Sequence, residues 1–139
     1  MDCVFCKILS GEYQGSFVYR DDVVTAFLDI APVNRGHVLV VPNIHCERFA
    51  DIPSEIVGHM FQAAQKITGG IEKSELNSEG FNIFLSDGEI AGQEVPHSHL
   101  HIAPRFKGDG HKIGFSHHDS EESVREKLEV TAKIISNNL

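Results

Sequence analysis

The chain has 139 residues, of which 41% are hydrophobic and 23% charged, and its formal net charge at pH 7 is −8. This composition predicts one soluble globular domain over residues 1–139, long enough to bury about two-thirds of its unfolded surface. The negative charge argues against a nucleic-acid polymer or an anionic membrane as partner, and no apolar run approaches the ~20 residues that a membrane-spanning helix needs.

Cys3 and Cys6 form a C-x-x-C pair near the N-terminus. We see no leader before them, so we expect a reducing, cytoplasmic compartment, in which such a pair is more often a metal site than a disulfide. A redox pair and two buried thiols are the alternatives. A zinc site needs two further ligands, and His45 is a natural candidate for one of them.

The first third of the chain reads as a short helix followed by strands. Apolar residues spaced three to four apart predict a helix over residues 4–9, and strands are expected over 16–19, 23–29 and 37–42. The first two strands meet at the polar pair Asp21-Asp22, which predicts a hairpin. Asp29 ends the second strand, a position where a carboxylate commonly initiates a turn.

A longer helix is expected to begin within residues 51–55 and to carry an apolar stripe as far as Ile71, with Gly69 and Gly70 weakening or ending it. A strand over 81–85 follows. The last helix is predicted to have Ser120 as its N-cap and one apolar face, with His117 and His118 on the surface before it. The fold class is therefore α+β, a five-stranded, mainly antiparallel sheet with two principal helices.

The stretch from Gln93 to Arg105 contains histidines at every second position, His97, His99 and His101, with Leu100 and Ile102 between or beside them. This period predicts a β-strand with the three imidazoles on one face. Because the chain is acidic overall, a phosphate site has to be local, built from backbone N–H groups, these histidines and Arg105. A His-rich surface strand or a plain metal-binding tract is the simpler alternative.

This stretch resembles the His-φ-His-φ-His-φ-φ motif of the histidine triad family of nucleotide hydrolases and transferases. Asp29 and the segment over residues 36–42, Gly-His-Val-Leu-Val-Val-Pro, strengthen the resemblance, which runs from about Cys3 to Arg105. It implies a homodimer that attacks the α-phosphorus of a purine nucleoside phosphoramidate, nucleotidyl ester or dinucleoside polyphosphate.

The resemblance also implies roles for individual residues. His99 would be the nucleophile, with His101 and His37 stabilising charge and orienting the ring. Asp29 would accept hydrogen bonds from the ribose, and Gln93 and Ser86 would lie at the phosphates. The base would occupy an apolar slot walled by Val4, Phe5, Ile8, Phe27 and Ile30, all of which are ordinary core residues in the simpler interpretation.

Zinc-containing members of the family resemble this chain at four positions, which implies structural Zn²⁺ held by Cys3, Cys6, His45 and His97. Three positions depart from the family pattern. Ser86 stands where many members carry Asn or Gln, Ser98 replaces an apolar residue, and Glu94 stands where some members place Ser or Thr against phosphate, which a carboxylate would repel. Rival functions are a nucleotide-binding scaffold or sensor without turnover and a metal-storage module.

Overall fold

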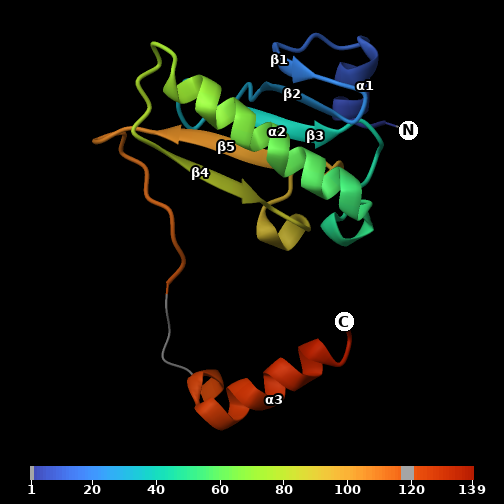
Figure 1. Cartoon of the computed structure of the whole chain (residues 1–139), viewed down its shortest axis with the longest axis vertical. Coiled ribbons are helices and arrows are strands. Elements are labelled where there is room, and N and C mark those ends of the chain that lie inside the picture. The colour runs from blue at the N-terminus through green and yellow to red at the C-terminus, as the bar shows by residue number, and fades with distance from the viewer. Residues whose placement is uncertain (1, 117–120) are drawn as a thin grey trace.

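The computed structural model describes residues 2–116 and 121–139. Its centre is a five-stranded sheet in the order β1-β2-β3-β5-β4, in which each neighbouring pair is antiparallel (Figure 1). The strands are β1 Phe17–Arg20, β2 Val24–Leu28, β3 Val38–Pro42, β4 Gly80–Leu85 and β5 Leu100–Arg105. The α+β fold class with a five-stranded antiparallel sheet is thereby confirmed.

The hairpin between β1 and β2 is closed by Asp21. Its Oδ1 accepts hydrogen bonds from the backbone N–H groups of Val23 and Val24, both at 2.8 Å, which is how a short acidic side chain stabilises a tight turn. Its Oδ2 accepts the Tyr19 hydroxyl at 2.7 Å and lies 2.6 Å from His59 Nε2. Because His59 belongs to the long helix, this carboxylate also ties that helix to the hairpin.

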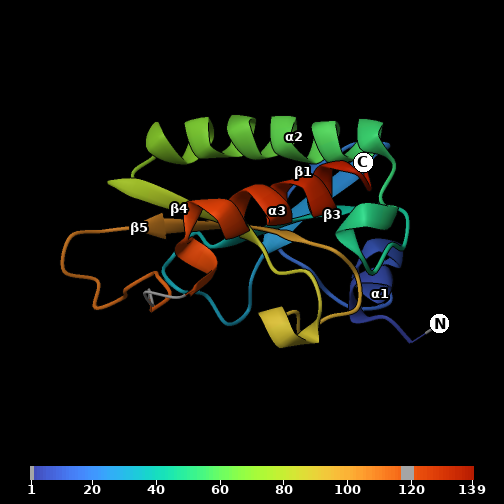
Figure 2. The same cartoon turned by 90° about the horizontal axis from the view of Figure 1, so that it is seen from below.

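The long helix α2, Ser54–Glu72, covers one face of the sheet (Figure 2). Met60, Ala63, Ala64 and Ile67 of its buried stripe pack against Val24, Ala26, Val38, Val40, Leu100 and Ile102 of the sheet. The expectation that Gly69 and Gly70 weaken or end the helix is wrong about the end. Ile71 is buried against the sheet, and tertiary packing of that stripe outweighs the poor helix propensity of two glycines.

The short helix α1, Val4–Ser10, lies on the other face of the sheet. Cys3 Sγ accepts the N–H of Cys6 at its start, and Gly11 ends it in the left-handed conformation at φ 86°. A second apolar cluster forms here from Cys3, Phe5, Phe27, Leu39 and Val41. Since Leu39 is paired with His101 in the sheet, His101 of β5 belongs to this face.

The loops contain short 3₁₀ turns, η1 Phe49–Asp51, η2 Glu89–Ala91 and η3 Glu121–Ser123. The last helix, α3 Arg125–Ser136, stands away from the sheet (Figure 1), and every residue from Ser123 to Leu139 is exposed. The predicted N-cap Ser120 and the pair His117 and His118 lie outside the described residues. Among the helices of residues 2–116 and 121–139, none is long and apolar enough to cross a bilayer.

Candidate functional site

The three triad histidines lie in β5 and in the segment directly before it. The strand begins at Leu100, so only His101 lies within it, and the expectation of one continuous strand through all three histidines is wrong. Pro96 precedes them, and the N–H of Ser98 donates to the carbonyl of Cys46 at 2.6 Å instead of joining the sheet. The rings nevertheless gather on the α1 side, since Phe5 contacts the rings of both His97 and His99.

His99 has a fixed tautomer. Its Nδ1 lies 2.8 Å from the carbonyl oxygen of His97, and a carbonyl only accepts, so Nδ1 carries the proton and Nε2 keeps its lone pair. The side chain is 6% exposed, and burial lowers its pKa below the ordinary value. The carboxylates of Asp29 and Glu94 act in the opposite direction. A neutral imidazole with a free Nε2 is therefore present at neutral pH.

His37 and His101 form a second ordered pair. The backbone N–H of Val33 donates to His37 Nδ1 at 3.0 Å, which leaves the proton of neutral His37 on Nε2. That Nε2 lies 3.0 Å from His101 Nδ1, so His37 donates to His101. Burial lowers the pKa of His37 and lowers that of His101 to about 4, with help from the neighbouring imidazoles. Neutral His101 then presents Nε2–H as a donor beside His99, ring centroids 4.9 Å apart.

Phe84, which sequence reasoning missed, sets the orientation of the His101 ring. It faces His101 across the β4–β5 ladder, with ring centroids 4.3 Å apart and planes within 5° of parallel. The partnership depends on strand register, so no local pattern in the sequence indicates it. The stacked ring restricts His101 to one plane.

Asp29 lies at the mouth of this cluster. Its Oδ1 accepts the N–H of Ala31 at 2.9 Å, which confirms the simple turn role, and its Oδ2 is 3.6 Å from His37 Nε2. The Asp29 side chain is 19% exposed, so it is not sealed within the protein. Its contact with ribose stays a prediction.

The residues predicted to form the base slot are only partly brought together. Phe5 and Phe27 meet edge to face at a centroid separation of 5.3 Å, and Ile8 packs on the same cluster. Val4 and Ile30, in contrast, are exposed, and Ile30 is 101% exposed. Phe5 and Phe27 are both buried, at 6% and 3% exposed, so Ile30 is not packed with them, and the base slot stays a prediction.

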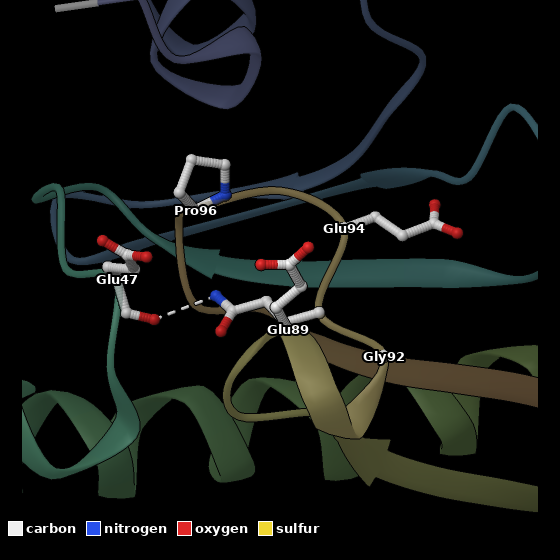
Figure 3. A pocket seen from close by; sticks show the side chains of 6 residues that line it. Glu47, Glu89, Gly92, Glu94 and Pro96 are labelled. Atoms are coloured by element: carbon white, nitrogen blue, oxygen red, sulfur yellow. Dashed lines mark hydrogen bonds between the residues drawn. The ribbon is translucent and has the colours of Figure 1, made fainter.

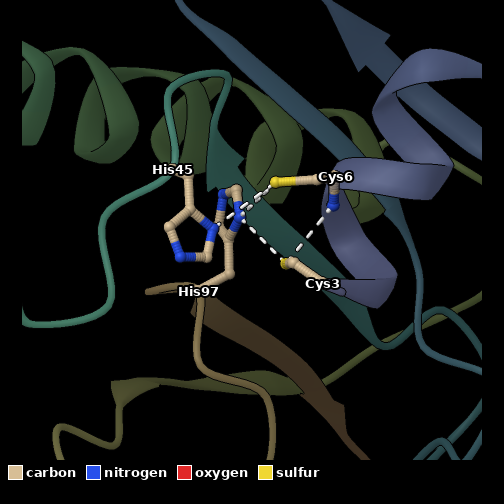
Figure 4. A group of neighbouring side chains, drawn as sticks. All are labelled: Cys3, Cys6, His45 and His97. Atoms are coloured by element: carbon tan, nitrogen blue, oxygen red, sulfur yellow. Dashed lines mark hydrogen bonds between the residues drawn. The ribbon is translucent and has the colours of Figure 1, made fainter. Parts of the chain in front are cut away.

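Cys3, Cys6, His45 and His97 meet at one point between α1 and the end of β3 (Figure 4). One donor atom from each lies within 4.8 Å of all the others. Nδ1 of His97 is 3.5 Å from Cys3 Sγ and 3.6 Å from Cys6 Sγ, and Nδ1 of His45 is 3.4 Å from Cys6 Sγ. These separations suit the edges of a tetrahedral zinc site.

The second ring nitrogen of His97 supports the same interpretation. Nε2 lies 2.8 Å from the carbonyl of Pro42, so it carries the proton and leaves Nδ1 free to coordinate. Metal-binding histidines commonly make this kind of outer hydrogen bond. The residues present therefore fit Zn²⁺ as a closed Cys₂His₂ site, and Cys46 is not part of the cluster.

Gln93 and Ser86 stand near the loop that leads to the triad. The Gln93 amide binds the backbone on both sides: Oε1 accepts the N–H of Gly88, and Nε2 donates to the carbonyls of Glu47 and Val95. Gln93 therefore shapes the loop, and its predicted contact with phosphate stays a prediction. Ser86 faces Gly92, where an added Cβ would come within 3.9 Å of its hydroxyl.

A cavity of about 460 Å³ beside this loop has an acidic lining. Glu47 and Glu89, which sequence reasoning missed, contribute to it with Gly92, Gln93, Glu94 and Pro96. Figure 3 shows the side chain of Glu94 extending away from those of Glu47 and Glu89. Three carboxylates in this lining would repel a phosphate, and the role of Glu94 toward a substrate stays a prediction.

Arg105, expected as a phosphate ligand, is occupied elsewhere. Its guanidinium donates to Asp109 at 2.7 and 2.9 Å, to Asn82 Oδ1 at 2.7 Å and to the carbonyl of His111. The ion pair also holds the pKa of the Asp109 carboxyl well below its usual range. Four of the five guanidinium N–H donors are thus engaged within the protein, so Arg105 anchors the chain beyond β5, and its predicted phosphate contact stays a prediction.

A family model described as "HIT domain" matches residues 10–108. An uncharacterized HIT-like protein of Methanocaldococcus jannaschii is 45% identical over 81% of this chain and 86% of its own. An adenylylsulfatase of Arabidopsis thaliana is 37% identical over 78% and 54%. An adenosine 5'-monophosphoramidase of Candida albicans is 33% identical over 74% and 70%.

Solved structures show the same architecture. A HIT family protein of Bacillus anthracis has a TM-score of 0.89 at 38% identity, over 99% of this chain and 97% of its own. A HIT family member from Bacillus subtilis reaches 0.90 at 38% identity over 100% and 98%. A zinc-bound histidine triad family protein of Mycobacterium smegmatis gives 0.76 at 36% identity over 100% and 99%.

Proposed function

The chain belongs to the histidine triad (HIT) family, and on that premise we propose that it is a nucleotide hydrolase or transferase that attacks the α-phosphorus of purine nucleotides. The observation that carries the proposal is the tautomer of His99. A ring nitrogen can attack phosphorus only with a free lone pair, and the His97 carbonyl fixes the proton on Nδ1 and leaves Nε2 free.

In the proposed reaction, His99 Nε2 forms a bond to the α-phosphorus, and the bond from phosphorus to the leaving amine, alcohol or phosphate breaks. The leaving group takes up a proton from the solvent-exposed side. The His99 ring becomes a nucleotidyl-imidazolium, whose positive charge is favoured by Asp29, Glu94 and the His97 carbonyl. Water then attacks phosphorus, releases the nucleoside monophosphate and restores neutral His99.

We assign His101 and His37 to stabilisation of the phosphoryl charge. His101 is oriented by Phe84 and by the donor His37, so its Nε2–H is held in place before the substrate arrives. A preorganised donor of this kind contributes roughly 3–4 kcal/mol to transition-state stabilisation. Because burial lowers the pKa of both histidines, both rings are already neutral at pH 7, and no proton has to be removed before the substrate binds.

Substrate recognition is proposed to use Asp29 for the ribose hydroxyls and the Phe5–Phe27 region for the base. The relatives that support a nucleotide substrate are the adenylylsulfatase and the adenosine 5'-monophosphoramidase. We also propose structural Zn²⁺ in the Cys₂His₂ cluster, supported by the similarity to a zinc-bound protein of Mycobacterium smegmatis, and a cytoplasmic homodimer as the working form.

A single-turnover experiment tests the proposal. Enzyme in excess over adenosine 5'-phosphoramidate labelled at the α-phosphorus is quenched in alkali, which preserves phosphoimidazole, and the label on protein is mapped by peptide analysis. We expect label on His99 in the wild type and in His101→Asn, where it accumulates more slowly, and none in His99→Asn. Tight nucleotide binding by the wild type without adduct or turnover would instead support a binding scaffold. A panel of phosphoramidates, adenylates and diadenosine polyphosphates then ranks the leaving groups.

A further inference from the structure

A groove of about 350 Å³ lies between the C-terminal half of α2 and the strands β1, β2 and β3. Its volume is within the range of small-molecule sites. It belongs to the α2 face of the sheet, whereas the catalytic histidines belong to the α1 face. None of the residues that line it is acidic, and most are apolar. The apolar side chains among them are Val18, Leu28, Val38, Ile67, Ile71 and Leu76.

Two local features keep the groove open. The register between β1 and β2 shifts between Phe17 and Tyr19, and this bulge places both Val18 and Tyr19 along the groove. Gly70 lines the helix side, and a Cβ added there would meet no atom within 4 Å. Glycine is unfavourable inside a helix, and packing within the chain does not require it at this position. Its missing side chain widens the groove.

The groove presents apolar surface to water. Val18 is 47% exposed and Leu28 is 40% exposed, although both come from the sheet. Beside them, Val38 and Ile67 are buried in the core cluster beneath α2. Exposed apolar side chains that border a recess are typical of a surface that a ligand covers. An apolar part of a ligand would therefore lie against Val18 and Leu28.

Lys66 is the only charged residue of the lining. Its ammonium lies 5.1 Å from the centre of the Tyr19 ring, which holds the cation beside the apolar surface. Within the part of the chain that the structure describes, Lys66 has no ion-pair partner. Asp21, which accepts the Tyr19 hydroxyl, also accepts two backbone N–H groups and lies 2.6 Å from His59. The Lys66 ammonium is therefore available to an anionic group of a ligand.

The groove lies behind two residues of the candidate site. Leu28 precedes Asp29, and Gly36 and Val38 flank His37, so the neighbours of both site residues line the groove. The N–H of Asp29 donates to the carbonyl of His37 at 2.9 Å, which ties the two segments together. A ligand in the groove would contact this backbone from the face opposite to the imidazoles. It would therefore bind without competing with a nucleotide.

We propose that the groove binds a free monocarboxylate with an apolar tail, such as a medium-chain fatty acid. The tail covers Val18 and Leu28, and the carboxylate pairs with Lys66. Covering the exposed apolar surface favours the tail, and the pairing with the ammonium favours the head group. One negative charge matches the one cation, whereas the net charge of −8 opposes a more highly charged anion.

Isothermal titration calorimetry of the full chain with octanoate, octanol and octylamine tests the class of ligand. We expect saturable binding of octanoate, one per chain, with a Kd at least about tenfold lower than those of the other two, because only octanoate pairs with Lys66. Lys66→Gln should raise the octanoate Kd at least about fivefold. The matched control, Lys73→Gln, removes a cation at the end of α2 outside the lining and should stay within about twofold.

A pair of glycine variants tests the place of binding. Gly70→Leu fills the groove and should raise the octanoate Kd at least about tenfold. Gly69→Leu makes the same change one residue earlier, outside the lining and also with open space around the added Cβ. Both variants exchange a helix glycine for a better helix former, so neither should lower Tm. A loss of binding confined to Gly70→Leu is therefore not a loss of folding.

Methyl NMR of the wild type locates the ligand directly. Octanoate should shift the methyl signals of Leu28 and Ile71 and leave those of Ile8, on the α1 face, unchanged, and saturating AMP should not displace it. Shifts at Ile8 or displacement by AMP would place octanoate at the base region and overturn the proposal. Absence of saturable binding, equal Kd values for octanoate and octylamine, or equal effects of the two glycine variants would also overturn it. None of these measurements involves the His99 adduct, so each proposal stands or fails separately.

Discussion

Replacement of Cys3 by serine is the sharpest perturbation of the proposed zinc site. Cys3 is 2% exposed, its sulfur caps α1 by accepting the N–H of Cys6, and it lies 3.5 Å from His97 Nδ1. Serine keeps an acceptor for the cap but is a poor zinc ligand. The substitution therefore removes the metal with little change to the helix start, and we expect about one zinc per wild-type chain and none in Cys3→Ser.

The magnitude follows from linkage. A metal present at about a thousand times its Kd adds about 4 kcal/mol to the free energy of unfolding. For a domain of this size each kcal/mol moves Tm by about 3–5 °C, so the loss is on the order of 12–20 °C. The catalytic effect should be smaller. α1 carries Phe5 toward the base region, so KM should rise, whereas the His99 tautomer depends on a backbone carbonyl and kcat should stay within about threefold.

Elemental analysis, calorimetric Tm and steady-state kinetics measure these three quantities on one preparation. Cys46→Ser is the matched control, because Cys46 lies outside the four-residue cluster and its sulfur is 3.8 Å from the Asp51 carbonyl. Wild-type protein purified without chelator and free of metal would refute the zinc site. An equal loss of Tm in Cys46→Ser would refute the specific role given to Cys3.

Three further outcomes are expected. Asp29→Ala should raise KM for ribonucleotides and nearly abolish their preference over 2′-deoxyribonucleotides, measured as a ratio of kcat/KM, and an intact preference removes Asp29 from the ribose. Phe84→Ala should lower kcat about tenfold with little change in KM, because His101 loses the ring stacked on it at 4.3 Å. Burial lowers the folded-state pKa of His101 to about 4, so protonation of the unfolded chain should erode stability as pH falls from about 6.5 to about 4. Urea unfolding at both ends of that range should show a smaller loss in His101→Asn than in the wild type, and equal losses would contradict the buried, neutral His101.

Sequence periodicity was sufficient for most of the architecture. Strands flanked by polar turns and helices with apolar stripes are local signals, and the hairpin at Asp21 and the stripe ending near Ile71 follow from them. The boundary at Leu100 does not, because it depends on a hydrogen bond from Ser98 to Cys46, more than fifty residues earlier. The persistence of α2 through Gly69 likewise depends on a sheet that lies elsewhere in the sequence.

Some features of the candidate site could likewise be predicted from the sequence, and others could not. The C-x-x-C pair and His45 indicated a zinc site, the resemblance to zinc-containing family members completed the set with His97, and the fold brings the four residues together. The stacking of Phe84 on His101 was not predictable, since it depends on which strands are neighbours and in what register. The capture of Arg105 by Asp109, four residues later, depends on the path of the loop that follows β5. Gln93 has the same limitation: a side-chain amide in a loop has many potential partners, and only the folded backbone shows that this one binds Gly88, Glu47 and Val95.

The hydrogen bond from Val33 to His37 has a consequence for which substitutions the protein tolerates. A main-chain amide cannot titrate, and every amino acid except proline supplies it. The backbone conformation of the loop therefore determines the direction of the hydrogen bonds from Val33 to His37 and from His37 to His101. The side chain at residue 33 is not needed for these bonds and can be replaced. We expect saturation mutagenesis to find residue 33 permissive with proline as the exception, while insertion or deletion of one residue between 33 and 37 inactivates the enzyme. A position can thus be indispensable to a catalytic network and still look variable among related sequences.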